Sequence, residues 1–185
     1  NREPYAASGA MGRSVADIVT MLNVITGPLP GDMFSLPRLE LPPLFAPIDG
    51  MRIALSPDLG YCEVDAEILD ALAATVETLR SLGATVDEVS LGWDERARET
   101  AMTHLDFQAG SLLAAQVPED RYDELTPYIR DMFERPAVSP IEWIASWEYA
   151  DEMYRSLQET VFGAGYDALI CPTMTTTSIA ADWGH

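Results

Sequence analysis

The segment from residue 51 to residue 91 constrains the fold most strongly. "MRIALSP" predicts a short buried strand that ends at Pro57, and "ATVDEVSL" predicts a second strand from Ala84. Between them, a helix is predicted with Asp65 as its N-cap and Gly83 as its stop. A strand, a helix and a strand joined by short links form a βαβ unit with parallel strands. We therefore expect an α/β fold, with this unit in a mixed sheet covered by helices.

Further helices and one more strand are predicted around this unit. Residues 15–25 have helical periodicity, and residues 27–50 form a connector rich in proline and glycine. Helices are also expected at about 94–116 and 125–133, and from Pro140 to about Gly163. A final strand, Ala168–Cys171, is stopped by Pro172.

Two of these helices carry start signals and apolar stripes. Ser14 with Asp17, and Ser139 with Glu142, have the spacing of capping boxes. The stripes are expected to face the core. Their members are Val15, Ile18, Val19, Leu22 and Ile25 in the first helix, and Ile141, Ile144, Trp147, Met153, Tyr154, Leu157 and Val161 in the last.

Composition limits the partners and the compartment. A chain of 185 residues with 48% hydrophobic content suits a single domain over 1–185. Its formal charge of −19 would repel nucleic acid and anionic membranes, so neither is an expected partner. No apolar run reaches the roughly 20 residues of a membrane span. Two distant cysteines without a metal-binding motif are typical of free thiols, so we expect a cytoplasmic protein.

The glycine-rich stretch "ASGAMGRS" at residues 7–14 suggests a phosphate-binding loop. In that motif a glycine would occupy the position of Ala7 and a lysine that of Arg13, and a strand would precede the loop. Since all three features are missing from the sequence pattern, the capped helix is the preferred interpretation. We expect no nucleotide and no other cofactor.

The residues offer no complete catalytic apparatus. No serine lies in a G-x-S-x-G context, and all 11 basic residues are arginine, which excludes a lysine base or Schiff base in this chain. His104 and the terminal His185 are too few for a histidine metal site, so no metal is expected. His104 itself is interpreted as a surface residue or a hydrogen-bonded structural one. We predict no catalytic residue here.

Three segments together resemble one family. "GAMGRSVADIVTMLNVITGPLPGDMFSLP" at 9–37, the strand-helix-strand segment at 50–91 and "YDALICPTM" at 166–174 are similar, in this order, to the part of amidase-signature enzymes that follows their catalytic core. The resemblance covers residues 9 to about 178. It implies the carboxyl-terminal part of the amidase-signature fold.

The resemblance also implies a function. The family hydrolyses or transfers amides with a Ser, cis-Ser and Lys triad, and none of the triad positions falls in this chain. We expect the chain to be a fragment that supplies scaffold and part of the pocket for a small-molecule amide, and to be inactive alone. Cys171, Pro172 and Thr173 are the candidate substrate-binding residues, because the family's corresponding loop lies near the acyl pocket.

Two further expectations stay open at this stage. The first is a non-enzymatic alternative, a stand-alone binding or assembly module, which the acidic surface and the missing nucleophile would suit. The second is self-association into a homo-oligomer, because apolar surface is expected where a missing part would pack.

Overall fold

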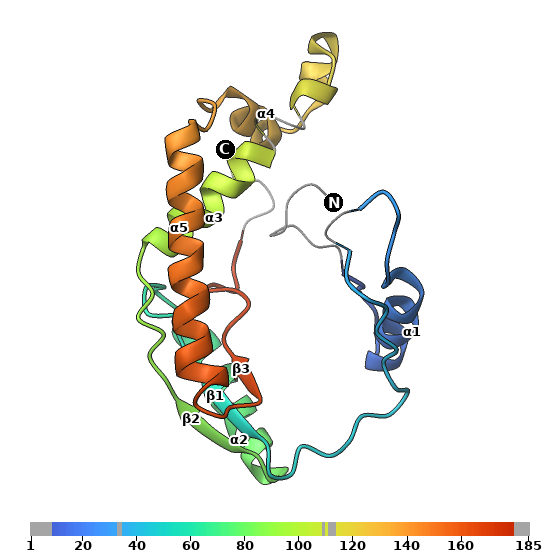
Figure 1. The fold of residues 1–185 in the computed structure, drawn as a ribbon, viewed down its shortest axis with the longest axis vertical. Helices are drawn as coiled ribbons and strands as arrows, with labels where there is room; N and C mark the ends of the chain where they lie inside the picture. The colour runs from blue at the N-terminus through green and yellow to red at the C-terminus, as the bar shows by residue number, and fades with distance from the viewer. Residues whose placement is uncertain (1–8, 33–34, 109, 111–113, 180–185) are drawn as a thin grey trace. The chain divides into compact units, whose positions relative to one another are not determined.

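The chain folds into two compact units, seen in a computed structural model that describes residues 9–32, 35–108, 110 and 114–179 (Figure 1). The units are Asn1–Pro47 and Ile48–His185. A single domain over the whole chain stays a prediction. The described helices and strands, in chain order, are α1 (Val15–Ile25), β1 (Arg52–Leu55), α2 (Ala66–Ser81), β2 (Thr85–Glu88), α3 (Arg96–Asp106), the 3₁₀ turns η2 (Ala114–Gln116) and η3 (Glu119–Glu124), α4 (Pro127–Glu134), α5 (Pro140–Leu157), the π-helical turn η4 (Gln158–Phe162) and β3 (Ala168–Ile170).

Helix α1 of the first unit begins at the predicted cap. The Ser14 hydroxyl accepts a hydrogen bond from the Asp17 backbone N–H (3.2 Å) and donates one to the Asp17 carboxylate (2.8 Å). In a full capping box, that carboxylate would instead accept from the Ser14 backbone N–H. The N-cap prediction is therefore confirmed, and the reciprocal half of the box is wrong because the hydroxyl takes the carboxylate.

The apolar stripe of α1 is buried only in its middle. Val19 is buried, and Ile18 and Leu22 are half-buried. Val15 and Ile25 are 65% and 44% exposed, so the prediction is wrong at both ends of the stripe. Within its own unit, α1 lies beside a connector without regular structure, which covers less of a helix surface than a second helix or a sheet would.

The connector at residues 27–50 is irregular, as predicted, in all of its described residues. One asparagine ties it to α1. The Asn23 side chain donates to the Leu41 carbonyl (2.9 Å) and accepts from the Leu41 N–H (2.8 Å), while Arg38 donates to the Asn23 carbonyl (2.8 Å). These paired bonds do locally what a strand ladder does over a longer stretch.

The predicted βαβ unit is present in the second unit of the chain. Strands β1 and β2 pair in parallel, with Arg52 opposite Thr85. Strand β3 pairs in parallel with the other side of β1, with Ile53 opposite Ala168, so the strand order is β2-β1-β3. The described sheet is parallel throughout, in place of the mixed sheet that we expected.

The two faces of the sheet pack against different parts of the chain. Ile53 packs with Val76 of α2 on one face. The next residue, Ala54, packs with Leu91 and with Val161 of η4 on the other. Since successive side chains of a strand point to opposite faces, the central strand β1 is buried on both sides.

The two ends of α2 differ from each other. Asp65 occupies the N-cap position but its side chain makes no capping hydrogen bond, so that prediction is wrong in mechanism. Its backbone N–H instead donates to the Thr175 carbonyl (2.9 Å). At the other end Gly83 has a φ of 94°, which confirms it as the residue that ends the helix.

Helix α3 is shorter than predicted, while α4 agrees with the helix expected at 125–133. The α-helical part of α3 ends at Asp106 and continues as a π-type turn at 107–108. Gly110 lies in the middle of the predicted helix, and its low helix propensity explains the early end. Part of the predicted segment, residues 109 and 111–113, lies outside the described residues.

Helix α5 begins with the complete capping box predicted for it. The Glu142 N–H donates to the Ser139 hydroxyl (3.2 Å), and the Ser139 N–H donates to the Glu142 carboxylate (2.8 Å). The helix runs alongside α3 (Figure 1). None of the described helices is both long enough and apolar enough to cross a lipid bilayer.

The predicted stripe of α5 is wrong for three of its members. Ile141, Ile144 and Tyr154 are exposed by 80%, 58% and 63%. Helix α5 instead faces α3 with small side chains, which let the two helices approach closely. The buried residues of α5 and α3 are Ser146, Tyr149, Ala150, Ala97, Thr100 and His104.

Candidate functional site

The candidate site lies where the parallel strands end. Parallel strands place their carboxyl ends together, and α/β proteins bind ligands at that end of the sheet. The buried Ser56 follows β1, and its N–H donates to the Ile170 carbonyl at the end of β3 (3.0 Å). Strand β3 ends at Ile170 rather than at Cys171, so the predicted residues Cys171, Pro172 and Thr173 open the loop beyond it. Cys171 and Thr173 are exposed, and Pro172 is half-buried.

The loop after β1 makes a tight turn at the same end. Asp58 accepts the Gly60 N–H on its side chain (2.7 Å), and its carbonyl accepts the Cys62 N–H (2.9 Å). Leu59 has a φ of 55°, the left-handed region that leucine rarely adopts. Such strain persists only where surrounding contacts fix the backbone, and it is common at functional sites.

Loops from all three strands meet beyond this end of the sheet. Gly60 lies against the backbone of Trp93, in the loop after β2, so closely that a Cβ would lie 2.8 Å from the Trp93 carbonyl oxygen. In the loop after β3, Thr177 donates to the Glu67 carboxylate on α2 (3.0 Å). The indole N–H of Trp93 is buried, and no described residue accepts a hydrogen bond from it.

Three ionisable side chains share this environment. Burial raises the pKa of Cys171, and the charge of Cys62 raises it further. Burial is also the main reason that the pKa of Tyr61 is raised, and Cys62 adds to that shift through its charge and a hydrogen bond. Both thiols are free. The fold therefore brings Cys62 and Tyr61 to the loop of Cys171, which the sequence pattern did not indicate.

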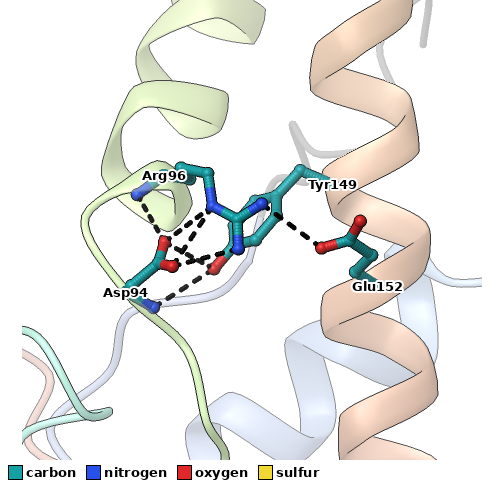
Figure 2. A network of polar contacts seen from close by, with 4 residues as sticks. All are labelled: Asp94, Arg96, Tyr149 and Glu152. Carbon is teal, nitrogen blue, oxygen red and sulfur yellow. Dashed lines mark hydrogen bonds and ion pairs between the residues drawn. The ribbon is translucent and has the colours of Figure 1, made fainter.

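A second polar cluster joins the start of α3 to α5 (Figure 2). Arg96 donates to both oxygens of Asp94 (3.0 and 3.1 Å) and to Glu152 (3.4 Å), and its guanidinium lies 4.2 Å from the centre of the Tyr149 ring. The hydrogen bonds from the Arg96 side chain and then its backbone lower the pKa of Asp94. The Tyr149 hydroxyl also donates to Asp94 (3.1 Å). All four side chains are engaged with one another, so the cluster serves to hold the helices together.

A hollow of about 310 Å³ opens between α3 and α5 next to this cluster. Its lining carries both signs of charge, which favours no single ligand class. The lining residues are Arg96, Glu99, Thr100, Thr103, Glu142, Ala145, Ser146 and Tyr149.

His104 is buried in the same helix interface. Its Nε2 lies 3.3 Å from the Ser146 hydroxyl, and its ring packs against Trp143 and Trp147, with centroids 4.6 and 4.9 Å away. Of the two interpretations of His104, the surface residue is wrong and the hydrogen-bonded structural residue is confirmed. Among the described residues, no three histidine, cysteine, aspartate or glutamate side chains are grouped so as to hold a metal ion.

The parallel α/β sheet defines the broad class, and comparison with known proteins defines the family. The family model described as Amidase matches residues 3–182. The chain therefore belongs to the Amidase family.

Similar curated proteins are enzymes or components of enzymes. The acylamidase of Rhodococcus erythropolis is 34% identical over 92 residues, which are 48% of this chain and 19% of that protein. The A-type component of the glutamyl-tRNA(Gln) amidotransferase of Pseudomonas aeruginosa is 37% identical over 94 residues, 47% of this chain and 19% of that protein. The matched part is thus about a fifth of the length of these relatives.

A solved structure supports the fold. A bacterial aryl acylamidase of the amidase-signature family superposes with a TM-score of 0.71 over 90% of this chain and 36% of that one, at 19% identity. The fold of the chain is therefore that of part of an amidase-signature enzyme.

Proposed function

We propose that this chain is the carboxyl-terminal part of an amidase, an enzyme that hydrolyses the C–N bond of a small carboxamide to an acid and ammonia or an amine. The observation that carries the proposal is the Amidase family match over residues 3–182. The likeness of 90% of the chain to about a third of an aryl acylamidase agrees with a partial enzyme.

The catalytic centre is proposed to lie outside these residues. A serine nucleophile needs an adjacent base, and in amidase-signature enzymes the resemblance implies that this base is a lysine. This chain contains 185 residues and no lysine. Its proposed contribution is the parallel sheet, the covering helices and part of the substrate pocket.

Cys171, Pro172 and Thr173 are the residues proposed to contact substrate. They leave the carboxyl end of β3, where ligands bind in parallel α/β sheets. The strained turn at Leu59 and the meeting of three loops at this end agree with a binding role. A cytoplasmic location, assembly into homo-oligomers, and the absence of cofactors and nucleic-acid partners stay predictions.

The test of the enzyme begins with the reading frame that contains Asn1. The proposal expects a Gly/Ser-rich segment with a lysine to be encoded before Asn1, and expects the longer product to hydrolyse simple carboxamides while the 185-residue chain does not. A frame that begins at Asn1 would overturn the enzyme and favour the stand-alone binding module. Turnover by the 185-residue chain alone would overturn the proposed location of the triad.

The test of the pocket uses two matched threonine variants of the longer product. Thr173→Ala is expected to raise KM for the carboxamide by about threefold or more, the effect of lost substrate binding. Thr78→Ala, on the exposed surface of α2 near its carboxyl end, is the control and should leave KM unchanged. Equal KM values for the two variants would contradict the pocket assignment.

A further inference from the structure

The two cysteines of the chain lie in loops that leave neighbouring strands at the same end of the sheet. Cys171 directly follows β3, and Cys62 closes the turn that follows β1. They are the only cysteines in the 185 residues, and both are free thiols. They are 109 positions apart in sequence, so only the fold brings their loops together.

Two backbone hydrogen bonds bracket the cysteines. On one side the Ser56 N–H donates to the Ile170 carbonyl (3.0 Å), one residue before Cys171. On the other side the Asp65 N–H donates to the Thr175 carbonyl (2.9 Å). The segment with Cys62 and the segment with Cys171 are therefore held against each other at both ends.

The turn around Asp58 shortens the path between these two anchor points. The Asp58 carbonyl accepts the N–H groups of both Tyr61 (3.2 Å) and Cys62 (2.9 Å), which folds the chain back toward the end of β1. The electrostatic effect of Cys62 on the pKa of Cys171 agrees with this placement, since a like charge acts on a pKa only from nearby.

We propose that Cys62 and Cys171 are a thiol pair that forms a reversible intramolecular disulfide in the folded chain when a low-molecular-mass disulfide such as oxidised glutathione is present. The proposal goes beyond the amidase function and does not depend on it. It assigns a modification to two side chains of this chain itself.

The reaction is two successive thiol–disulfide exchanges. Cys171 is the more exposed of the two cysteines. Its thiolate attacks one sulfur of oxidised glutathione, which forms a mixed disulfide and releases one glutathione thiolate. The Cys62 thiolate then attacks the Cys171 sulfur, forms the Cys62–Cys171 bond and releases the second glutathione. Two protein thiols lose two electrons and two protons, and the oxidant is reduced to two glutathione thiols.

The test compares the folded and the denatured chain. The 185-residue chain is equilibrated in buffers of graded reduced and oxidised glutathione, with and without guanidinium chloride, and quenched by alkylation. Mass spectrometry then gives the fraction of the Cys62–Cys171 disulfide. We expect the effective concentration of the pair to be at least about tenfold higher in the folded chain, because the fold holds the two loops together. An equal or lower value in the folded chain would overturn the proposal.

Single-cysteine variants identify the bond. Cys62→Ser and Cys171→Ser should each take up one glutathione and form no intramolecular disulfide, while the wild-type chain loses two hydrogens in mass and retains no glutathione. A wild-type chain that retains two glutathiones, or that cross-links only between molecules, would contradict the proposal. The folded-against-denatured comparison uses wild-type protein, so it stands even where a variant folds poorly.

Discussion

At the scale of single residues, the Tyr149 hydroxyl tests how α3 is held on α5. It accepts the Asp94 backbone N–H and donates to the Asp94 carboxylate, both at 3.1 Å. Tyr149→Phe keeps the ring beneath Arg96 but strands the Asp94 N–H. We expect the free energy of unfolding, measured by urea denaturation, to fall by about 1–2 kcal/mol.

The control for Tyr149→Phe is Glu152→Gln. Glu152 and Arg96 are each more than half exposed, and exposed ion pairs contribute little to stability. The loss for Glu152→Gln should therefore be clearly smaller. An equal loss for both variants would mean that the charge of Glu152, and not the buried hydroxyl, holds the cluster.

Two glycines separate backbone strain from steric contact. Gly60 and Gly92 both have positive φ, 86° and 68°. A Cβ on Gly60 would meet the Trp93 carbonyl oxygen at 2.8 Å, whereas a Cβ on Gly92 would meet no atom within 4 Å. Gly92→Ala should cost about 1 kcal/mol of unfolding free energy for the left-handed backbone alone. Gly60→Ala should cost at least twice as much in the same urea experiment, and similar costs would show that the two loops separate easily.

Residue contacts could be predicted from the sequence only where they are local. Ser139 and Glu142 are three positions apart, so their capping box is visible as a pattern. Arg96 and Tyr149 are 53 positions apart, and their stacking depends on how α3 packs against α5. Cys62 was likewise not associated with Cys171, because only the pairing of β1 with β3 brings their loops together.

At the scale of secondary-structure elements, the capping box of α5 is the feature most open to a direct test. Ser139 accepts the Glu142 N–H, one of the donors that a helix start leaves without a partner. Ser139→Ala should lower the free energy of unfolding by about 1 kcal/mol at pH 7. Ser81→Ala, a matched exposed serine near the end of α2, is the control and should cost less.

The same box predicts a dependence on pH. Hydrogen bonds from the Ser139 side chain and backbone hold the pKa of Glu142 below its ordinary value of 4.5. Its stabilising effect is therefore complete above that value and is lost as the pH falls through the lower pKa of the folded state. Glu142→Gln should make the free energy of unfolding fall less steeply below pH 4.5 than in the wild type. Parallel curves for the two proteins in acid urea titrations would contradict this.

Elements were predictable where pattern and boundaries agree. The βαβ unit has short links, a glycine stop and two short strands, and each of these signals is local. The faces of the helices were less predictable. Helix α5 buries Ser146 and Ala150 and exposes Ile141 and Ile144, because close packing against α3 favours small side chains over apolar ones.

At the scale of the whole molecule, the two compact units differ in what they bury. The second unit contains both clusters of buried apolar side chains around the sheet, whereas among its described residues the first unit buries one apolar side chain, Val19. We expect residues 48–185 expressed alone to unfold cooperatively in urea, and residues 1–47 alone to show no cooperative transition, because so small a core does not offset chain entropy. A sigmoidal transition for residues 1–47 would contradict this.

The family could be recognised from the order of three segments, while the substrate pocket could not be built from them. The matched order of the 9–37, 50–91 and 166–174 segments agrees with the Amidase match over residues 3–182. The role of Cys171, Pro172 and Thr173 stays a prediction, because a pocket depends on side chains that come together only in the complete fold.

The strand order β2-β1-β3 limits how this sheet grows. Strand β1 already has a hydrogen-bonded neighbour on each side, so a fourth strand, from this polypeptide or another, must add laterally to β2 or β3. The outward backbone groups of these two short strands are thus the template for any enlargement of the sheet. When no such strand is supplied, the same rows of amides and carbonyls are where unwanted cross-β contacts between copies would begin.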